Sequence, residues 1–434
     1  RVDTNATPNA AMLFGLRDHM LPQLEESNMT KLYTEMELPL SSVLYEMERE
    51  GFRVDRTILK QLQAQFNEQS ESLAKRIYES TGETFNILSP KQLGEVLFEK
   101  LGLPTGKKNK SGFSTDAETL ESLTDRHPAI PLILEYRFLT KLKSTFVDGL
   151  LNVVSDENDR VRTQFNQCVT ATGRISSTEP NMQNIPVRTS QGREIRKAFI
   201  ASEGNLLVDA DYSQIELRLL AHISGDEGMI HAFNSGKDIH RTTASEVFRV
   251  PFEDVTSELR SAAKAVNFGI VYGISDFGLA RNLDIPVKRA AEYIKLYFDR
   301  YPGVKAYLDR SVEDAKRTGY AVTMFDRRRA MLELKSSNFN TRSFGERVAM
   351  NMPIQGTAAD IIKLAMVKVS EKLKERGLKT KLILQVHDEL IFDTPSAEVE
   401  EVVALVHDCM EHVASLSVEL DADVKVGHSW YETK

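Results

Sequence analysis

Two apolar segments that carry aspartates stand far apart in this chain, and they constrain its fold more than any other feature. The first, 205–211, reads as a buried strand that ends in Asp211. The second, 379–393, is two apolar runs on either side of Asp388, which is the pattern of a β-hairpin. Between the two segments, from 226 to about 349, the apolar spacing is mostly helical. The order predicts an α+β fold in which a helical insertion interrupts an antiparallel sheet.

The remaining segments predict further helices joined by polar loops. The best delimited helix runs from Arg56 to about Thr81, because Asp55 stands at its N-cap position and Gly82 follows its end. The polar stretch 172–188 is longer than a compact domain tolerates without a function. The other expected elements are helices at 37–50, 131–151, 213–224, 358–376 and 396–416, strands at 161–165, 197–200 and 418–426, and an exposed loop at 106–114.

Composition places the chain among folded globular proteins. It has 434 residues, 41% of them hydrophobic and 27% charged, which argues against disorder and implies two to four subdomains. No apolar run approaches the ~20 residues of a membrane span. Cys168 and Cys409 are too few for a disulfide framework or a zinc site, so we expect a reducing cytoplasm. The first residue is Arg1, not Met, so we expect a fragment of a longer chain.

The net charge of −8 does not exclude nucleic acid as a partner. Many nucleic-acid binders are basic overall, but in a large enzyme the local field of a cleft matters more than the total charge. Two basic clusters, 107–110 and 327–329, could supply such a field. Each could equally be a solvated loop.

Asp211 and Asp388 are candidate ligands for a metal ion. Carboxylates at strand ends of a shared sheet can converge even when they are distant in sequence. Mg²⁺ takes one or two carboxylates and keeps positions for water and phosphate, and a pair of such ions can activate a hydroxyl and stabilise a leaving oxygen. Alternatively, each aspartate only bonds the backbone of its own turn. Asp209 and Glu389 are rival acids beside them.

The segment 257–273 combines cations and rings on one helix face. Arg260, Lys264, Phe268 and Tyr272 recur at intervals of four, so they form one line that is basic at one end and aromatic at the other. A nucleoside triphosphate has the same polarity, with phosphates for the cations and a base for the rings. The alternative is an ordinary amphipathic helix.

The helix that follows Asp211 begins with a capping-box pattern. In Ser213–Glu216 the serine would cap the helix and Glu216 would bond back to its start. The same side chain could also face a ligand, because the helix starts beside the candidate metal site.

Three of these segments, in the right order, resemble motifs A, B and C of the family A DNA polymerases. They are 211–218, 260–273 and 385–389, and 172–186 and 353–360 match further family segments. The resemblance covers about 34–434 and is greatest to bacterial members. It implies a right-hand polymerase with an exonuclease-domain remnant (1–33), a helical thumb (34–150) with a basic tip loop (106–114), a palm in two parts (151–239 and 346–434) and helical fingers (240–345) that carry the motif B helix (257–273).

The resemblance also implies a reaction and its residues. A family A member adds dNTPs to a primer 3′-OH on a template, in replication and repair, with two Mg²⁺ ions for which Mn²⁺ can substitute. The implied metal ligands are Asp211, Asp388 and the Tyr212 carbonyl, with Glu389 as a nearby acid, and Lys264 is also implied to protonate the pyrophosphate. The implied dNTP contacts are Arg260, Lys264, Phe268, Tyr272, His240, Gln214 and Glu216, the last as the steric gate against a 2′-hydroxyl. The implied primer–template contacts are Arg174, Asn181, Gln183, Arg347, Asn351, Gln355 and His387, with Lys107, Lys108 and Lys110 at the thumb tip.

Some features depart from the family pattern or leave other functions open. No acidic nuclease cluster precedes Thr34, so neither 3′→5′ nor 5′→3′ nuclease activity is expected. The loop 326–334 lacks the glycine and proline that relatives more often have. Phe268, where some relatives have tyrosine, implies that dideoxynucleotides are disfavoured. The rivals are a single-subunit RNA polymerase, a two-metal nuclease and a non-catalytic DNA-binding remnant. A monomer without membrane association is expected.

Overall fold

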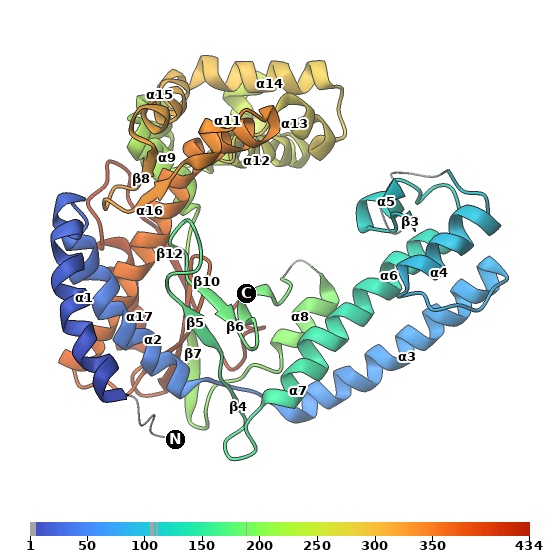
Figure 1. Ribbon diagram of the computed structural model, residues 1–434, viewed down its shortest axis with the longest axis horizontal. Coiled ribbons are helices and arrows are strands. Elements are labelled where there is room, and N and C mark those ends of the chain that lie inside the picture. Colours follow the sequence, from blue (N-terminus) through green and yellow to red (C-terminus); the bar gives the residue numbers. More distant parts are fainter. Residues whose placement is uncertain (1–5, 105–107, 110–111, 188) are drawn as a thin grey trace. The chain divides into compact units, whose positions relative to one another are not determined.

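The computed structural model describes residues 6–104, 108–109, 112–187 and 189–434 (Figure 1). The chain divides into two compact units, each assembled from separate stretches of sequence. The first comprises 1–49, 165–177 and 208–425, and the second comprises 50–164, 178–207 and 426–434.

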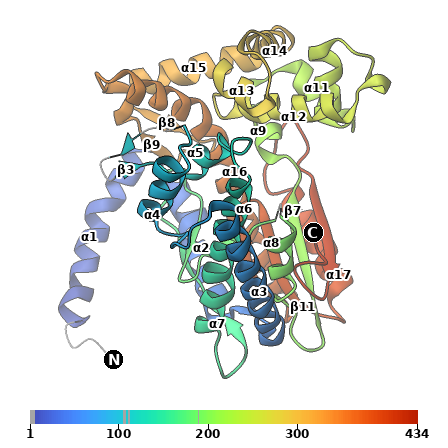
Figure 2. The same cartoon turned by 90° about the vertical axis from the view of Figure 1, so that its right-hand side faces the viewer.

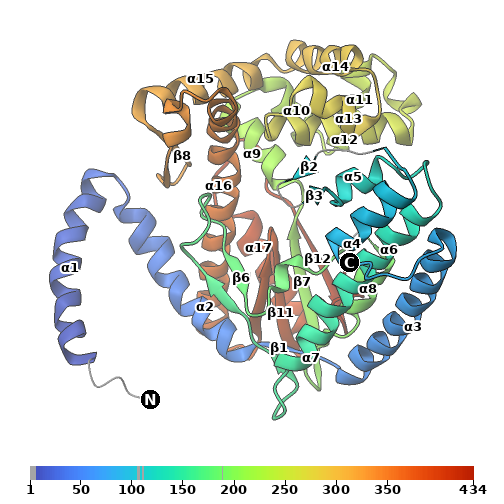
Figure 3. The ribbon, with the colours of Figure 1, turned by 45° about the vertical axis from the view of Figure 1, so that its right-hand side comes forward.

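A four-stranded sheet lies at the centre of the first unit (Figure 3). Its strand order is β10 (Lys381–Val386), β11 (Glu389–Pro395), β7 (Asn205–Tyr212) and β12 (Ala422–Gly427). β10 and β11 are antiparallel, and Val386 pairs with Glu389, so only two residues form the turn between them. Strand β11 is buried along almost its whole length, and α17 (Val399–Glu411) packs against it. The predicted α+β fold and the predicted hairpin are confirmed.

The helical insertion after β7 is also confirmed. Its elements are α9 (Ile215–Ser224), α10 (Glu227–Asn234), α11 (Ile239–Phe248), α12 (Ser257–Val271), α13 (Asp276–Leu283), α14 (Val287–Arg300) and α15 (Pro302–Thr318), followed by the hairpin of β8 (Tyr320–Val322) and β9 (Arg328–Ala330). Helices α11 to α14 pack on one another as a cluster (Figure 2). Polar N-caps start most of these helices. Asp238 caps α11 and Thr256 caps α12 by accepting backbone N–H bonds.

One long helix, α16 (Phe339–Glu375), continues from this cluster to the sheet region of the first unit. The sequence predicted a helix only from 358, but α16 passes through Pro353 without a break. Proline removes one backbone donor and usually ends or kinks a helix. Here the long helix is buried along much of its length, and burial of that kind outweighs a single lost hydrogen bond. Helices α1 (Ala6–Glu26) and α2 (Leu38–Glu50) precede the second unit, with a π-helical segment at Leu32–Glu37.

The second unit is mainly helical. Its helices are α3 (Arg56–Thr81), α4 (Pro90–Gly94), α5 (Ala117–Glu121), α6 (Ala129–Leu142), α7 (Gly149–Val153) and α8 (Ser190–Arg196), and its strand pairs are β1 (Phe52–Arg53) with β4 (Arg160–Val161) and β2 (Lys108–Asn109) with β3 (Gly112–Phe113). Helix α3 packs on α6 over an apolar core that includes Ile77 and Ile130. The predicted bounds of α3 are confirmed, with Asp55 as its cap and Gly82 in the left-handed conformation at its end.

Several predicted elements have other bounds. The expected loop 106–114 contains the short β2–β3 hairpin, and the expected helix 131–151 is α6 and α7 joined by a π-helical segment at Lys143–Asp148. The expected strand 197–200 forms only isolated bridges, at Phe199 and Ile200. A short strand β5 (Gln164–Asn166) pairs with β6 (Ser176–Thr178). Both cysteines are free. Within the described ranges, no helix has the length and apolar character needed to cross a bilayer.

We expect Asp55→Ala to destabilise the second unit by about 0.5–2 kcal/mol, because the Asp55 carboxylate accepts from the N–H groups of Thr57 (2.7 Å) and Ile58 (3.3 Å). The measurement is the urea unfolding midpoint together with amide exchange in the first turn of α3. Asp55→Asn retains an acceptor and serves as the control. An alanine variant with unchanged exchange there would contradict the role of this cap.

Candidate active site

Asp388 lies in the tight turn between β10 and β11. His387, the first turn residue, has a left-handed backbone (φ 54°), and its carbonyl accepts from the Gln385 amide at 2.6 Å. A two-residue hairpin turn requires such a conformation. The turn therefore holds Asp388 at the end of the sheet.

Asp211 is brought to the same end of the sheet by β7, which neighbours β11. The next residue, Tyr212, donates its backbone N–H to the carbonyl of Asp388 at 3.1 Å. The Tyr212 ring is buried, and its hydroxyl donates to the Met410 carbonyl, which anchors this end of β7. The two aspartates are thus neighbours, as the sequence predicted.

Burial first, then the negative charge of Asp211 and to a smaller extent that of Glu216, together raise the pKa of Asp388 to about 7. Arg174 acts in the opposite direction. Two carboxylates that share a partly desolvated site repel each other, and one of them retains its proton more easily. A bound cation relieves this repulsion. The pair consequently fits a hard divalent ion, although no group of three or more acidic, histidine or cysteine side chains arranged for a metal exists in the described ranges.

Glu216 contacts two side chains from other parts of the first unit. Its carboxylate accepts from Arg174 at 2.7 Å and from the Tyr272 hydroxyl at 2.8 Å, and it is only 7% exposed. The predicted capping box is wrong. Helix α9 begins at Ile215, after Gln214, which has a left-handed backbone and makes no side-chain cap. The Glu216 side chain bonds Arg174 and Tyr272 and not the start of its own helix.

The line of cations and rings lies on α12 as predicted, with Tyr272 immediately after the last helical residue. Arg260 pairs with Asp238 through two nitrogens, at 2.7 and 2.9 Å, and both side chains remain more than a third exposed. Lys264, one turn further on, is exposed. The Phe268 ring lies 5.7 Å from the His240 ring, centroid to centroid. The helix presents both its charges and its rings on the predicted line.

His240 is buried beside this line, at the start of α11. Its pKa is lowered to about 4, mainly by burial and also by the positive charges of Arg260 and Lys264, although Asp238 acts in the opposite direction. The ring is therefore neutral at physiological pH.

The residues predicted to contact primer and template fall in both units. Arg347, Asn351 and Gln355 recur on one face of α16, and Asn351 donates to the Val271 carbonyl at 3.2 Å. Arg174 and His387 also belong to the first unit, and His387 is exposed. Asn181, Gln183 and Lys108 belong to the second, where Asn181 caps a short turn by accepting from the Gln183 N–H. Lys107 and Lys110 lie outside the described residues.

Sequence reasoning missed a buried ion network around Arg327. This guanidinium bonds Asp360 (2.6 Å) and Glu37, and Lys363 bonds Glu37 at 2.8 Å. The expectation of a solvated loop or a binding patch is wrong for Arg327, because Asp360 is fully buried and needs a cation. A Cβ on Gly173 (φ 84°) would lie 2.5 Å from Arg327 Nε, so the arginine packs directly against the turn that precedes Arg174. The only indication of this network in the sequence was the helical spacing of Asp360 and Lys363, which puts an acid and a base on one helix face.

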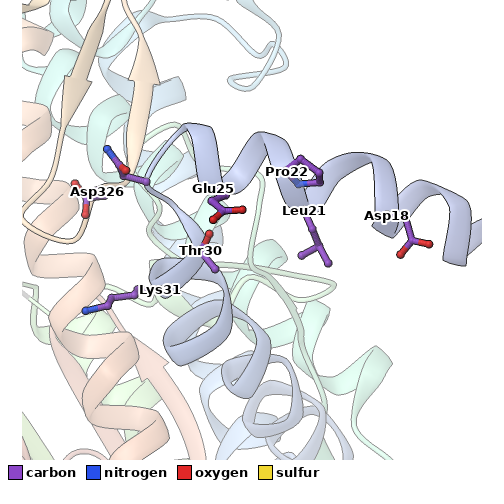
Figure 4. A pocket seen from close by; sticks show the side chains of 8 residues that line it. Asp18, Leu21, Pro22, Glu25, Thr30, Lys31 and Asp326 are labelled. Carbon is purple, nitrogen blue, oxygen red and sulfur yellow. The ribbon is translucent and has the colours of Figure 1, made fainter.

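A wide hollow in the first unit lies away from these residues. Figure 4 shows it between α1 and the turn before β9, with a volume of about 880 Å³. Its lining includes Leu21, Pro22 and Asp326, and neither Asp211 nor Asp388 borders it. The candidate site is the carboxylate pair with α12, not this hollow.

Comparison with known proteins gives consistent matches. The model for DNA polymerase family A matches residues 56–432. DNA polymerase I of Caldicellulosiruptor bescii is 53% identical over 98% of this chain and 50% of its own length. DNA polymerase I of Bacillus subtilis is 51% identical over 98% of this chain and 48% of its own length. The chain thus spans about half the length of these relatives.

A solved structure is also similar. It is described as the POL domain of Pol1 from M. smegmatis in complex with DNA primer-template and dNTP. It is 46% identical, with a TM-score of 0.92, and the match covers 97% of this chain and 74% of that chain.

We expect Asp388→Asn to stabilise the metal-free protein at pH 8 but not at pH 4. The pKa of Asp388 is raised to about 7 in the folded state, so its contribution to stability is fully present below pH 4 and is lost as the pH rises through 7. The measurement is the urea midpoint in EDTA at both pH values. The control is Asp314→Asn, an exposed carboxylate on α15. Equal effects of Asp388→Asn at the two pH values would contradict the coupling.

Proposed function

Because the chain belongs to DNA polymerase family A, we propose that it extends DNA primers by template-directed addition of dNTPs to the 3′-OH. One observation carries the proposal. The fold brings Asp211 and Asp388 to the same end of the sheet. Glu216, whose negative charge helps to raise the pKa of Asp388, accepts a hydrogen bond from Tyr272 at the end of α12 and so links the carboxylates to that helix. The DNA and dNTP in the similar solved structure support the same substrates here.

Asp211 and Asp388, with the backbone carbonyl of Tyr212, would hold two Mg²⁺ ions. Bound there, such ions lower the pKa of the primer 3′-OH and neutralise the charge that develops on the leaving pyrophosphate. The carboxylates themselves fix the position at which the primer end and the α-phosphate meet. The raised pKa of Asp388 reflects burial and repulsion from Asp211, which a bound cation would relieve.

Arg260 and Lys264 would bind the triphosphate, and Phe268 would cover the sugar. Arg260 must exchange Asp238 for phosphate, and the exchange costs little because both partners are exposed to water. Lys264, one turn further along α12, would donate a proton to the pyrophosphate. Gln214 and His240 complete the nucleotide contacts.

Glu216 would exclude ribonucleotides. Its carboxylate is held from two sides by Arg174 and Tyr272, so it cannot move aside cheaply for a 2′-hydroxyl. Tyr272 would gate the template base. Glu389, which is buried next to Asp388, would stay outside the metal coordination.

Arg174, Arg347, Asn351 and Gln355 would probe the minor groove at the primer terminus. Purine N3 and pyrimidine O2 acceptors are common to all correct base pairs there, so these contacts test pairing without reading sequence. Asn181, Gln183 and His387 would add contacts to primer and template, and the lysines of 107–110 would contact backbone phosphates. We assign 34–150 to the thumb, 240–345 to the fingers, and 151–239 with 346–434 to the palm of a monomeric enzyme.

We expect Asp388→Ala to lower primer extension about a thousandfold or more, because several kcal/mol of transition-state stabilisation depend on the metal ligands. Its affinity for primer–template should remain close to that of the unmutated chain. Extension is measured with Mg²⁺ and dNTPs, and affinity by fluorescence anisotropy, with Asp314→Ala as the control. Normal extension by Asp388→Ala would exclude the mechanism. Degradation of the DNA without dNTPs would favour the two-metal nuclease.

We expect Glu216→Ala to relax the discrimination against ribonucleotides about 10- to 200-fold, because a steric block against one hydroxyl is removed. Extension with single dNTPs and NTPs, compared as kcat/KM, measures the change. Glu216→Gln retains the bulk and should retain most of the discrimination. Equal use of both sugars by the unmutated chain would favour an RNA polymerase.

A further inference from the structure

Three polar side chains are buried together where α11 and α12 pack. His240 and Thr243 come from α11, one turn apart, and Asn267 comes from the C-terminal half of α12. Their exposed fractions are 2%, 1% and 0%. A buried polar group costs free energy unless it is hydrogen-bonded, so each contact in this cluster matters to its neighbours.

The amide of Asn267 links the other two residues. Its nitrogen Nδ2 lies 3.0 Å from Nδ1 of His240 and 3.1 Å from the hydroxyl of Thr243, and its oxygen accepts from the same hydroxyl at 3.3 Å. An amide nitrogen can only donate. A donor that faces Nδ1 requires a lone pair on that ring atom, so the proton of the neutral imidazole is on Nε2.

The surroundings keep the ring neutral. The charged groups that face His240 are Asp238, at the start of its own helix, and Arg260 and Lys264 from α12. Burial and the two cations oppose a positive charge on the ring, and Asp238 only partly offsets them. Across the part of the chain that the structure describes, Asn267 is the one hydrogen-bonding partner of this ring, through Nδ1.

We propose that Asn267 is a positioning residue that fixes His240 in its neutral Nε2–H form, so that the ring presents a hydrogen-bond donor to a phosphate oxygen of the bound nucleotide. The inference rests on the proposed function, which places the triphosphate along Arg260 and Lys264. A ring with the opposite tautomer would direct a lone pair at the phosphate and repel it. Asn267 would thus act on the substrate only through His240.

The first test observes the tautomer directly. ¹⁵N-histidine NMR of the full chain at pH 7.5, with His240→Gln to assign the signal, should show a protonated Nε2 and an unprotonated Nδ1. In Asn267→Asp the new carboxylate accepts from the ring, so Nδ1 should become protonated. A protonated Nδ1 in the unmutated chain would overturn the proposal. The unmutated spectrum decides this alone, even if a variant fails to fold.

The second test uses the pH dependence of KM for dNTP in primer extension. In the unmutated chain, KM should be flat from pH 6 to 9. In Asn267→Asp the carboxylate stabilises the imidazolium, which still donates from Nε2 at low pH. At higher pH the ring loses the Nε2 proton, and KM should rise about 2- to 10-fold, the value of one hydrogen bond, with a smaller change in kcat. A flat profile in this variant would also overturn the proposal.

The control is Thr242→Val, on the same helix, because the Thr242 hydroxyl is buried without a hydrogen bond in the described structure. It should leave both the His240 signal and the KM profile unchanged. The experiments distinguish a failure of the proposed function from a failure of the inference about Asn267. A chain that extends no primers defeats the proposed function and leaves the tautomer measurable, whereas normal extension with an Nδ1–H ring defeats only the inference about Asn267.

Discussion

The backbone hydrogen bond from Tyr212 to the carbonyl of Asp388 is the contact on which the candidate site depends. It joins the end of β7 to the turn of the β10–β11 hairpin and so sets two carboxylates side by side. Strand pairing supplies the free energy, and the local repulsion between the acids is tolerated because the rest of the sheet is buried and well paired. The repulsion between the two carboxylates is locally unfavourable, and the stability of the surrounding fold offsets it.

The same principle extends to the groups around the pair. Glu216 accepts from Arg174 and Tyr272, and Arg327 packs against Gly173 in the turn that leads to Arg174. Arg327 is in turn fixed by the buried Asp360 and the partly buried Glu37. The chain of contacts that begins at Glu216 thus ends in the core of the first unit at Asp360 on α16, which is fully buried.

Local patterns in the sequence predicted what local physics determines. The bounds of α3 follow from Asp55 and Gly82, and the hairpin follows from two apolar runs around Asp388. The line on α12 follows from its spacing. Sequence reasoning yielded no prediction, or a wrong one, for side chains whose hydrogen-bond partners lie far away in the chain. The pattern of Ser213 and Glu216 predicted a capping box, but the Glu216 carboxylate accepts hydrogen bonds from Arg174 and Tyr272 instead. Such pairings depend on tertiary packing, which no window of sequence contains.

Asn351 has a mechanical consequence for α12. It donates from α16 to the carbonyl of Val271, the last residue of α12, so the aromatic end of that helix is tied to α16. The end near Arg260 instead packs on α11 through Leu259 and Ala263 and pairs with Asp238. Arg260 stands about 16 Å from the tie, at roughly 1.5 Å per residue. By that geometry, a tilt of ~10° about the tie carries Arg260 by about 3 Å and leaves Tyr272 almost in place. A rotation of α12 together with α11 about this tie therefore moves the cations much further than the rings.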